Sequence, residues 1–131
     1  MDSRANRGRR PVVLAADDEE DILGLIVFRL EHSGYTVIPA RDGAEALELA
    51  RNSQPDLAIL DVMMPKIDGF ELTRRLREDE ETSEMPIILL TARTQEDDVQ
   101  RGIDAGADDY IRKLFSPEEL RSRVEAILGR R

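Results

Sequence analysis

The chain has 131 residues, no cysteine and a formal net charge of −9. This length is typical of one domain with a substantial core, and the lack of cysteine excludes disulfides and thiolate metal sites. The negative charge argues against a nucleic-acid surface, which needs clustered Lys and Arg. A short basic cluster lies at the amino terminus, where we expect residues 1–10 to form a disordered tail before a single domain over residues 11–131.

Five apolar runs alternate with five stretches of helical spacing. The runs cover residues 12–16, 35–39, 57–60, 87–90 and 109–112. Because the runs at 12–16, 57–60 and 87–90 are continuously apolar, the strands that these runs predict belong to a parallel sheet with helices on both faces. Right-handed crossovers then favour the strand order 2-1-3-4-5. The predicted fold class is α/β, a flavodoxin-like (βα)5 doubly wound parallel sheet.

Local signals mark the boundaries of these elements. Pro39 has no N–H to give to a ladder, so the strand at 35–39 is expected near an edge of the sheet. In the fourth helix we expect Val99 and Ile103 to face the core. The predicted helix N-caps are Asp42, Asp68, Thr94 and Ser116. No secretory leader and no apolar run of membrane-spanning length is present, so we expect a cytoplasmic protein without membrane contact.

Polar residues follow four of the predicted strands. Asp17 and Asp18 come after the first strand, Asp61 after the third, Thr91 after the fourth and Lys113 after the fifth. The first and third strands are neighbours at the switch point of this fold, so three carboxylates converge there. They would repel each other without a cation, and Mg²⁺ suits a site that combines carboxylates with phosphate oxygens. Singly, each residue also fits an ordinary strand end; jointly, they predict a phosphoryl site with a carboxylate acceptor.

The acids that continue the run after Asp18 have a simpler explanation. Glu19, Glu20 and Asp21 are expected in the first turn of the next helix, where acidic side chains complement the helix dipole.

Several short segments match a known family. They are Asp17-Asp18, LDVMMP at 60–65, Asp68-Gly69, LTA at 90–92, and AGADDY at 105–110 followed by Lys113 and Phe115. With these segments the chain resembles the receiver domain of two-component response regulators, over about residues 11–129.

The resemblance implies a phosphorelay regulator with assigned residues. Asp61 would accept a phosphoryl group from a partner sensor histidine kinase or phosphotransfer protein. Mg²⁺ would be the cofactor, bound by Asp17, Asp18, Asp61 and the backbone carbonyl of Met63. Thr91 and Lys113 would bind the phosphoryl oxygens, and Tyr110 would be the switch aromatic that turns inward as Thr91 moves.

The resemblance also implies how the signal leaves the domain. Phosphorylation would change the face formed by the last two helices and the strand at 109–112, and a downstream effector protein or domain would read it. Asp109, Glu119 and Arg123 on this face could pair across a phosphorylation-dependent homodimer. The chain ends just after the last predicted helix, so we expect no effector within it and no direct nucleic-acid binding. It would not be an enzyme beyond its own phosphotransfer and dephosphorylation.

Other functions stay open beside this one. A phosphatase resembling the haloacid dehalogenase class also uses Asp, Mg²⁺, Thr and Lys, but it needs an Asp-x-Asp pattern after its first strand. A flavin carrier on this fold would need a hydroxyl- and glycine-rich phosphate loop where this chain has acids. An interaction module that has lost phosphorylation is favoured only by Leu114.

Leu114 stands where the family has a proline joined through a cis peptide. A cis bond before a residue other than proline is unfavourable by about 2.5–4 kcal/mol, and an exposed ion pair contributes about 1 kcal/mol or less. We therefore expect a trans Lys113-Leu114 bond, at least without phosphate, with the lysine ammonium displaced from Asp61 or held less firmly.

Overall fold

The computed structural model describes residues 9–92 and 96–129. Residues 1–8 of the tail expected at residues 1–10, and the expected cap Thr94, lie outside this part. In chain order the elements are β1 (Val12–Ala16), α1 (Glu20–His32), β2 (Thr36–Ala40), α2 (Gly43–Ser53), β3 (Leu57–Asp61), α3 (Gly69–Glu78), β4 (Ile87–Thr91), α4 (Glu96–Ala105), β5 (Asp109–Arg112) and α5 (Pro117–Leu128).

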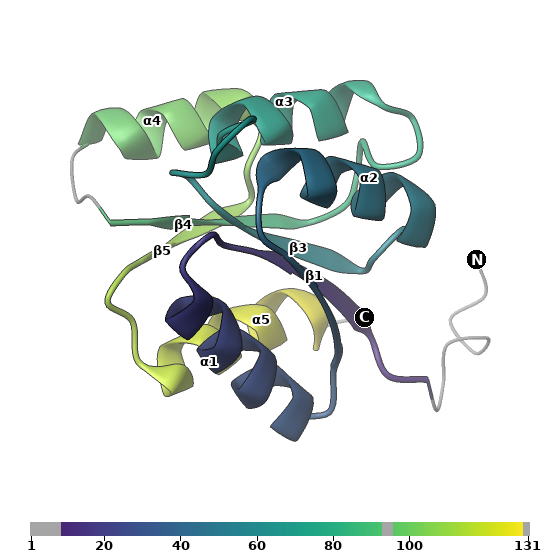
Figure 1. Ribbon diagram of the computed structural model, residues 1–131, viewed down its shortest axis with the longest axis vertical. Coiled ribbons are helices and arrows are strands. Elements are labelled where there is room, and N and C mark those ends of the chain that lie inside the picture. Colours follow the sequence, from purple (N-terminus) through teal and green to yellow (C-terminus); the bar gives the residue numbers. More distant parts are fainter. Residues whose placement is uncertain (1–8, 93–95, 130–131) are drawn as a thin grey trace.

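The five strands form one parallel sheet in the order β2-β1-β3-β4-β5. This confirms the predicted fold class and strand order. β2, which contains Pro39, is an edge strand as expected. β1 and β3 are adjacent in the middle of the sheet, so the loops that follow them emerge side by side (Figure 1).

Helices cover both faces of the sheet, α1 and α5 on one and α2, α3 and α4 on the other (Figure 1). Successive residues of β1 alternate between these faces: Val13 and Ala15 pack in the cluster that contains α1 and α5, and Leu14 and Ala16 in the cluster that contains α2 and α3. Because both faces of β1 are buried, its sequence is apolar at every position. Within the described residues, no helix is long and apolar enough to span a membrane.

Three of the predicted helix caps are confirmed. The side chains of Asp42, Asp68 and Ser116 each accept a hydrogen bond from the backbone N–H three residues further on. Each bond satisfies a donor that the first turn of a helix leaves without a partner. Near the amino terminus, Arg10 ties the start of the described chain to the end of α1. It donates hydrogen bonds to the backbone oxygens of Glu31 (2.7 Å) and Gly34 (3.1 Å).

Arg77, at the end of α3, holds together the segments that lead into β4 and β5. Its guanidinium donates to the backbone oxygens of Gly106 (2.9 Å) and Met85 (2.7 Å) and pairs with Asp108 (2.9 Å). Asp108 in turn accepts from the backbone N–H of Ile87 at the start of β4 (2.8 Å). The end of α3, the start of β4 and the α4–β5 turn are therefore held together by one cation.

The prediction that Ile103 faces the core is wrong. Its side chain is 59% exposed, whereas the neighbouring Gly102 is buried. A Cβ atom on Gly102 would lie 3.0 Å from Leu89 Cδ1, so it is Gly102 that α4 presents to the sheet. Successive residues of a helix differ by about 100° in direction, which turns Ile103 toward the flank of α4.

Candidate functional site

Two buried aspartates lie at the carboxyl ends of the central strands. Asp17 follows β1 and is fully buried, and Asp61 is the last residue of β3 and 3% exposed. Their backbones are held by the sheet, because Asp17 N–H donates to Ala40 O (3.1 Å) and Val62 N–H donates to Leu90 O (2.9 Å). The open edge beside a switch point is where α/β sheets of this type bind their ligands.

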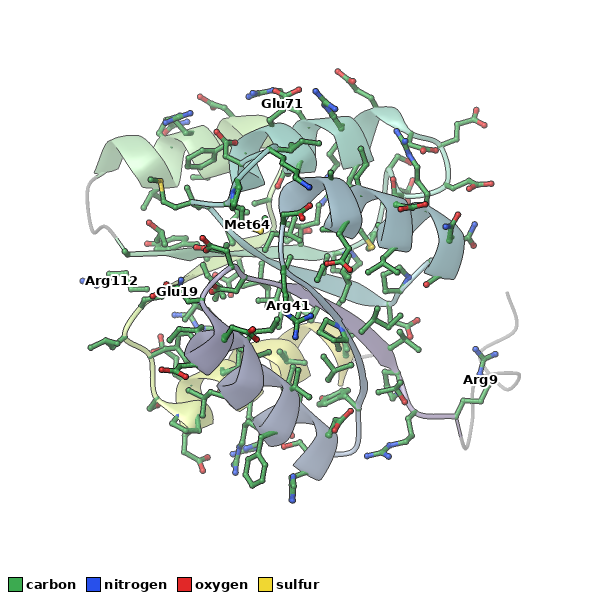
Figure 2. All side chains as sticks on the ribbon, viewed as in Figure 1. Arg9, Glu19, Arg41, Met64, Glu71 and Arg112 are labelled. Atoms are coloured by element: carbon green, nitrogen blue, oxygen red, sulfur yellow. The ribbon has the colours of Figure 1, made fainter. Side chains whose placement is uncertain are left out.

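Lys113 reaches these aspartates from the β5–α5 loop. Its Nζ lies 2.9 Å from Asp17 Oδ2, 3.3 Å from Asp61 Oδ1 and 2.6 Å from Glu19 Oε1. The lysine side chain is 8% exposed, and its backbone N–H donates to Thr91 O (2.8 Å). Figure 2 shows Glu19, at the β1–α1 turn, and Arg112, at the end of β5, at the same edge of the sheet.

The environment shifts the pKa of both Asp61 and Lys113. Burial, and then the negative charge of Asp17, raise the pKa of Asp61 to about 7 against the opposing effects of Lys113 and a hydrogen bond from the Met63 backbone. Burial by itself would lower the pKa of Lys113, but its contacts with Glu19, Asp17 and Asp61 outweigh burial and hold that pKa above its usual value. The lysine is therefore charged, while Asp61 is easily protonated.

The carboxylates are arranged as a possible metal site. Asp17, Glu19 and Asp61 each bring one oxygen into a group whose members lie within 4.8 Å of one another. With all three ionised, the single ammonium leaves two negative charges unbalanced, which a divalent cation would neutralise. The buried Oδ2 of Asp17 is in ionic contact with the Lys113 ammonium (2.9 Å). An all-oxygen donor set whose negative charge exceeds that of the one ammonium beside it fits a hard cation.

This group differs from the acids singled out in the sequence. Asp18 is exposed and is not among the three, whereas Glu19 is. Glu19 is the N-cap of α1, and its backbone N–H donates to Asp17 Oδ1 (2.9 Å). The turn after β1 thus places the Glu19 carboxylate beside Lys113. The sequence had suggested only that Glu19 would complement the dipole of its helix.

The remaining sequence-predicted residues lie around this cluster. Thr91 is the last residue of β4 and 4% exposed, so it is buried at the same edge. Met63 is exposed in the β3–α3 loop and Tyr110 is 40% exposed on β5. Gly69 lets α3 start close to the cluster, because a Cβ there would lie 2.5 Å from the backbone oxygen of Asp61.

The expectation of a trans Lys113-Leu114 bond is wrong. The bond is cis, and Lys113 contacts Asp61 instead of being displaced from it. The expectation treated the lysine's attraction as one exposed pair, whereas the structure surrounds a buried ammonium with three carboxylates. Leu114 itself is 93% exposed.

The fold and the site together define a flavodoxin-like domain with an acidic, lysine-containing site at the switch point between β1 and β3. The sequence model of one protein family, the response regulator receiver domain, matches residues 13–125 of the chain. The chain therefore belongs to the family of response regulator receiver domains.

Individual relatives and structures agree with this assignment. The alkaline phosphatase synthesis transcriptional regulatory protein PhoP of Bacillus subtilis is 50% identical over 118 residues, which are 90% of this chain and 48% of that protein. The crystallised chemotaxis protein CheY4 of Vibrio cholerae has a TM-score of 0.87 and 35% identity, covering 91% of this chain and 99% of that one.

A third comparison is with the receiver domain of the sensor histidine kinase PA1611 from Pseudomonas aeruginosa, which has a magnesium ion coordinated in its active site cleft. It has a TM-score of 0.85 and 30% identity, covering 92% of this chain and 98% of that one. The chain spans about half the length of the curated relatives that it matches.

Proposed function

We propose that Asp61 is the residue that accepts the phosphoryl group. The observation that carries this proposal is the place of its carboxylate, buried at the end of β3 with the Lys113 ammonium 3.3 Å away. A carboxylate oxygen attacks the phosphorus of a phosphohistidine on a partner kinase or phosphotransfer protein. The P–O bond forms as the P–N bond breaks, the imidazole nitrogen keeps the electron pair, and an acyl phosphate remains on Asp61.

Lys113 and Thr91 are proposed to hold the phosphoryl oxygens. The ammonium is already charged and fixed at this edge, so it need not reorganise when negative charge arrives. Thr91 supplies a hydroxyl from the end of the neighbouring strand. The ionised Asp61 is the nucleophile. Because burial and Asp17 raise its pKa to about 7 without a metal, a cation bound beside it would help to keep it ionised.

The proposed cofactor is Mg²⁺, held by Asp17, Asp18, Asp61 and the backbone carbonyl of Met63, with Glu19 added because its carboxylate lies in the same group. The support is the oxygen donor set and its two unbalanced charges, together with the magnesium ion in the related receiver of PA1611. When bound, Mg²⁺ would neutralise the carboxylates and share its remaining positions with phosphoryl oxygens.

The proposed output is a change on the face formed by α4, β5 and α5. Tyr110 is partly exposed on β5, close in sequence to Lys113, so it can report the state of the site by turning inward. Arg123 pairs within the chain with Asp109 (2.8 Å) and Glu119 (3.7 Å). A phosphorylation-dependent homodimer through this face would have to exchange these pairs for pairs between subunits.

The organisation proposed for the chain is a basic tail at residues 1–10 and the receiver over residues 11–131. Its partners would be a sensor histidine kinase or phosphotransfer protein and an effector protein or domain, in line with relatives such as the regulator PhoP. The receiver itself would catalyse only its own phosphorylation and dephosphorylation.

Incubation with Mg²⁺ and a small acyl phosphate, followed by intact-mass measurement, tests the acceptor. The chain should gain one phosphoryl group, and Asp61→Asn should not. Asp104→Asn, an exposed aspartate on α4, is the matched control and should label as the parent chain does. Equal labelling of Asp61→Asn and the parent would place the acceptor elsewhere.

A further inference from the structure

A cavity of about 170 Å³ lies beneath α4, against β4 and β5. It is distinct from the acid cluster, because Asp17, Glu19, Asp61 and Lys113 do not line it. Most of its wall is apolar, and the side chains that matter here are Val62, Phe70, Leu89, Val99, Ile103 and Tyr110.

The cavity is bounded on one side by residues of α4. Gly102 is packed tightly against the sheet, because a Cβ there would lie 3.0 Å from Leu89 Cδ1, and Ile103, although 59% exposed, forms part of the outer wall. Phe70 is 2% exposed, and the guanidinium carbon of Arg101 lies 4.2 Å from the centroid of its ring. This contact fixes the ring that forms one wall.

Size and lining identify what the cavity can hold. An apolar cavity of about 150 Å³ lined by aliphatic and aromatic side chains stays dry and binds benzene. The cavity under α4 has a similar volume. It is open on the side of Ile103 and Tyr110, which are 59% and 40% exposed, and its polar lining residues include Thr91 and Asp109. We propose that it binds small uncharged molecules with a single aromatic ring, and that such a ligand holds the receiver in its resting state.

The second half of this proposal rests on the proposed function. Tyr110 lines the cavity and is 40% exposed, and Thr91, which lines it as well, is proposed to bind the phosphoryl group. If Tyr110 turns inward on phosphorylation, its phenol ring enters the volume that the ligand fills. Ligand and ring then exclude each other, so the ligand binds the resting state alone. By linkage, phosphorylation weakens ligand binding by the same factor by which the ligand opposes the switch.

The probe is p-cresol, which is the tyrosine side chain without its backbone. Its binding to the unphosphorylated chain is followed by nuclear magnetic resonance, with the methyl signals of the cavity residues as reporters. We expect saturable binding of one molecule. At about ten times its dissociation constant, a ligand confined to the resting state raises the ratio of resting to switched protein by about 11-fold.

Two substitutions close the cavity by different routes. Gly102→Leu adds a side chain next to Leu89 and Phe70, and Val99→Phe enlarges a side chain on another part of the wall. Either should weaken p-cresol binding by more than about tenfold, because overlap removes the contacts of the ring. The matched control is Gly24→Leu, a glycine-to-leucine change in α1 where nothing lies within 4 Å of the added Cβ. It should bind p-cresol as the parent chain does. Val99→Phe decides the question if Gly102→Leu does not fold.

The outcomes separate this proposal from the proposed function. Absence of saturable binding, or equal binding to the parent chain and a folded cavity variant, overturns the ligand site. Binding that phosphorylation leaves unchanged, in protein whose label is confirmed by mass, overturns the coupling. If Asp61 is never labelled while p-cresol binds as described, the proposed function fails and the ligand site stands.

Discussion

Replacing the Asp61 carboxylate by an amide should stabilise the protein when no metal is present. In the native state Asp61 is 3% exposed and lies near Asp17, and its pKa is raised from 3.8 to about 7. Each unit of difference between folded and unfolded pKa corresponds to about 1.4 kcal/mol. The ionised carboxylate therefore lowers the free energy of unfolding by roughly 4 kcal/mol at pH 8, where both states are deprotonated. The attraction of Lys113 is already contained in this pKa.

The sign of the pH dependence follows from the direction of the shift. A carboxyl group whose pKa is raised on folding favours the native state while it is protonated. Its contribution is complete below pH 3.8 and is lost as the pH rises through about 7. The stability gained by Asp61→Asn, relative to the parent chain, should therefore grow between about pH 4 and pH 7 and be constant above.

Urea unfolding of both chains in the presence of a chelator, at pH 5 and pH 8, measures this difference. Asp104→Asn, an exposed aspartate on α4, is the control and should show no comparable rise. Saturating Mg²⁺ should shrink the effect, since a cation that binds the native carboxylates competes with the proton. An Asp61→Asn protein that is less stable than the parent at pH 8, or a difference that is the same at both pH values, would refute the reasoning.

Further predictions follow from the metal site, the Arg77 contacts and the output face. Mg²⁺ at about 100 times its dissociation constant should stabilise the fold by about 2.7 kcal/mol, and Asp18→Ala should remove most of the shift in Tm; an unchanged shift would move the metal away from Asp18. Arg77→Met should lower the free energy of unfolding by about 2–4 kcal/mol, because it removes the donor from several partly buried carbonyl oxygens and the partner from Asp108. The control is Arg75→Met, because Arg75 pairs with Glu71 at the surface, and this change should alter the free energy of unfolding by less than about 1 kcal/mol. If the two variants lose the same stability, the Arg77 contacts do not hold the fold together as described. Sedimentation should show a larger mass on phosphorylation if the α4–β5–α5 face dimerises, and an unchanged mass would leave a monomeric switch.

The strands and the helix starts could be predicted because they depend on local chemistry. Runs such as Val12–Ala16 are apolar on both faces, which only a sheet covered by helices on both sides can bury. Asp42, Asp68 and Ser116 cap their helices through bonds to residues three positions on, so the signal lies within one turn. The order of the strands then brought Asp17, Asp61 and Lys113 to one edge.

The errors concern side chains whose positions depend on distant parts of the chain. Glu19 was explained by its own helix, but its carboxylate meets Lys113, which is far away in sequence. The helical spacing of Val99 and Ile103 suggested a buried stripe, but Gly102 is the residue that packs against Leu89 of the sheet while Ile103 is exposed, and a glycine gives no hydrophobic signal in the sequence. At Lys113 the number of carboxylates around the ammonium decides its position, and that number appears only when the loops after β1, β3 and β5 are assembled.

Locating the acyl phosphate on the chain tests the central claim most directly. Borohydride reduces an aspartyl phosphate to homoserine, so chain that has been incubated with Mg²⁺ and an acyl phosphate can be reduced, digested and sequenced by mass spectrometry. Homoserine should appear at position 61, in amounts that follow the phosphorylated fraction. Reduction product at Asp17, Asp18 or any other carboxylate, with an intact aspartate at position 61, would contradict the account.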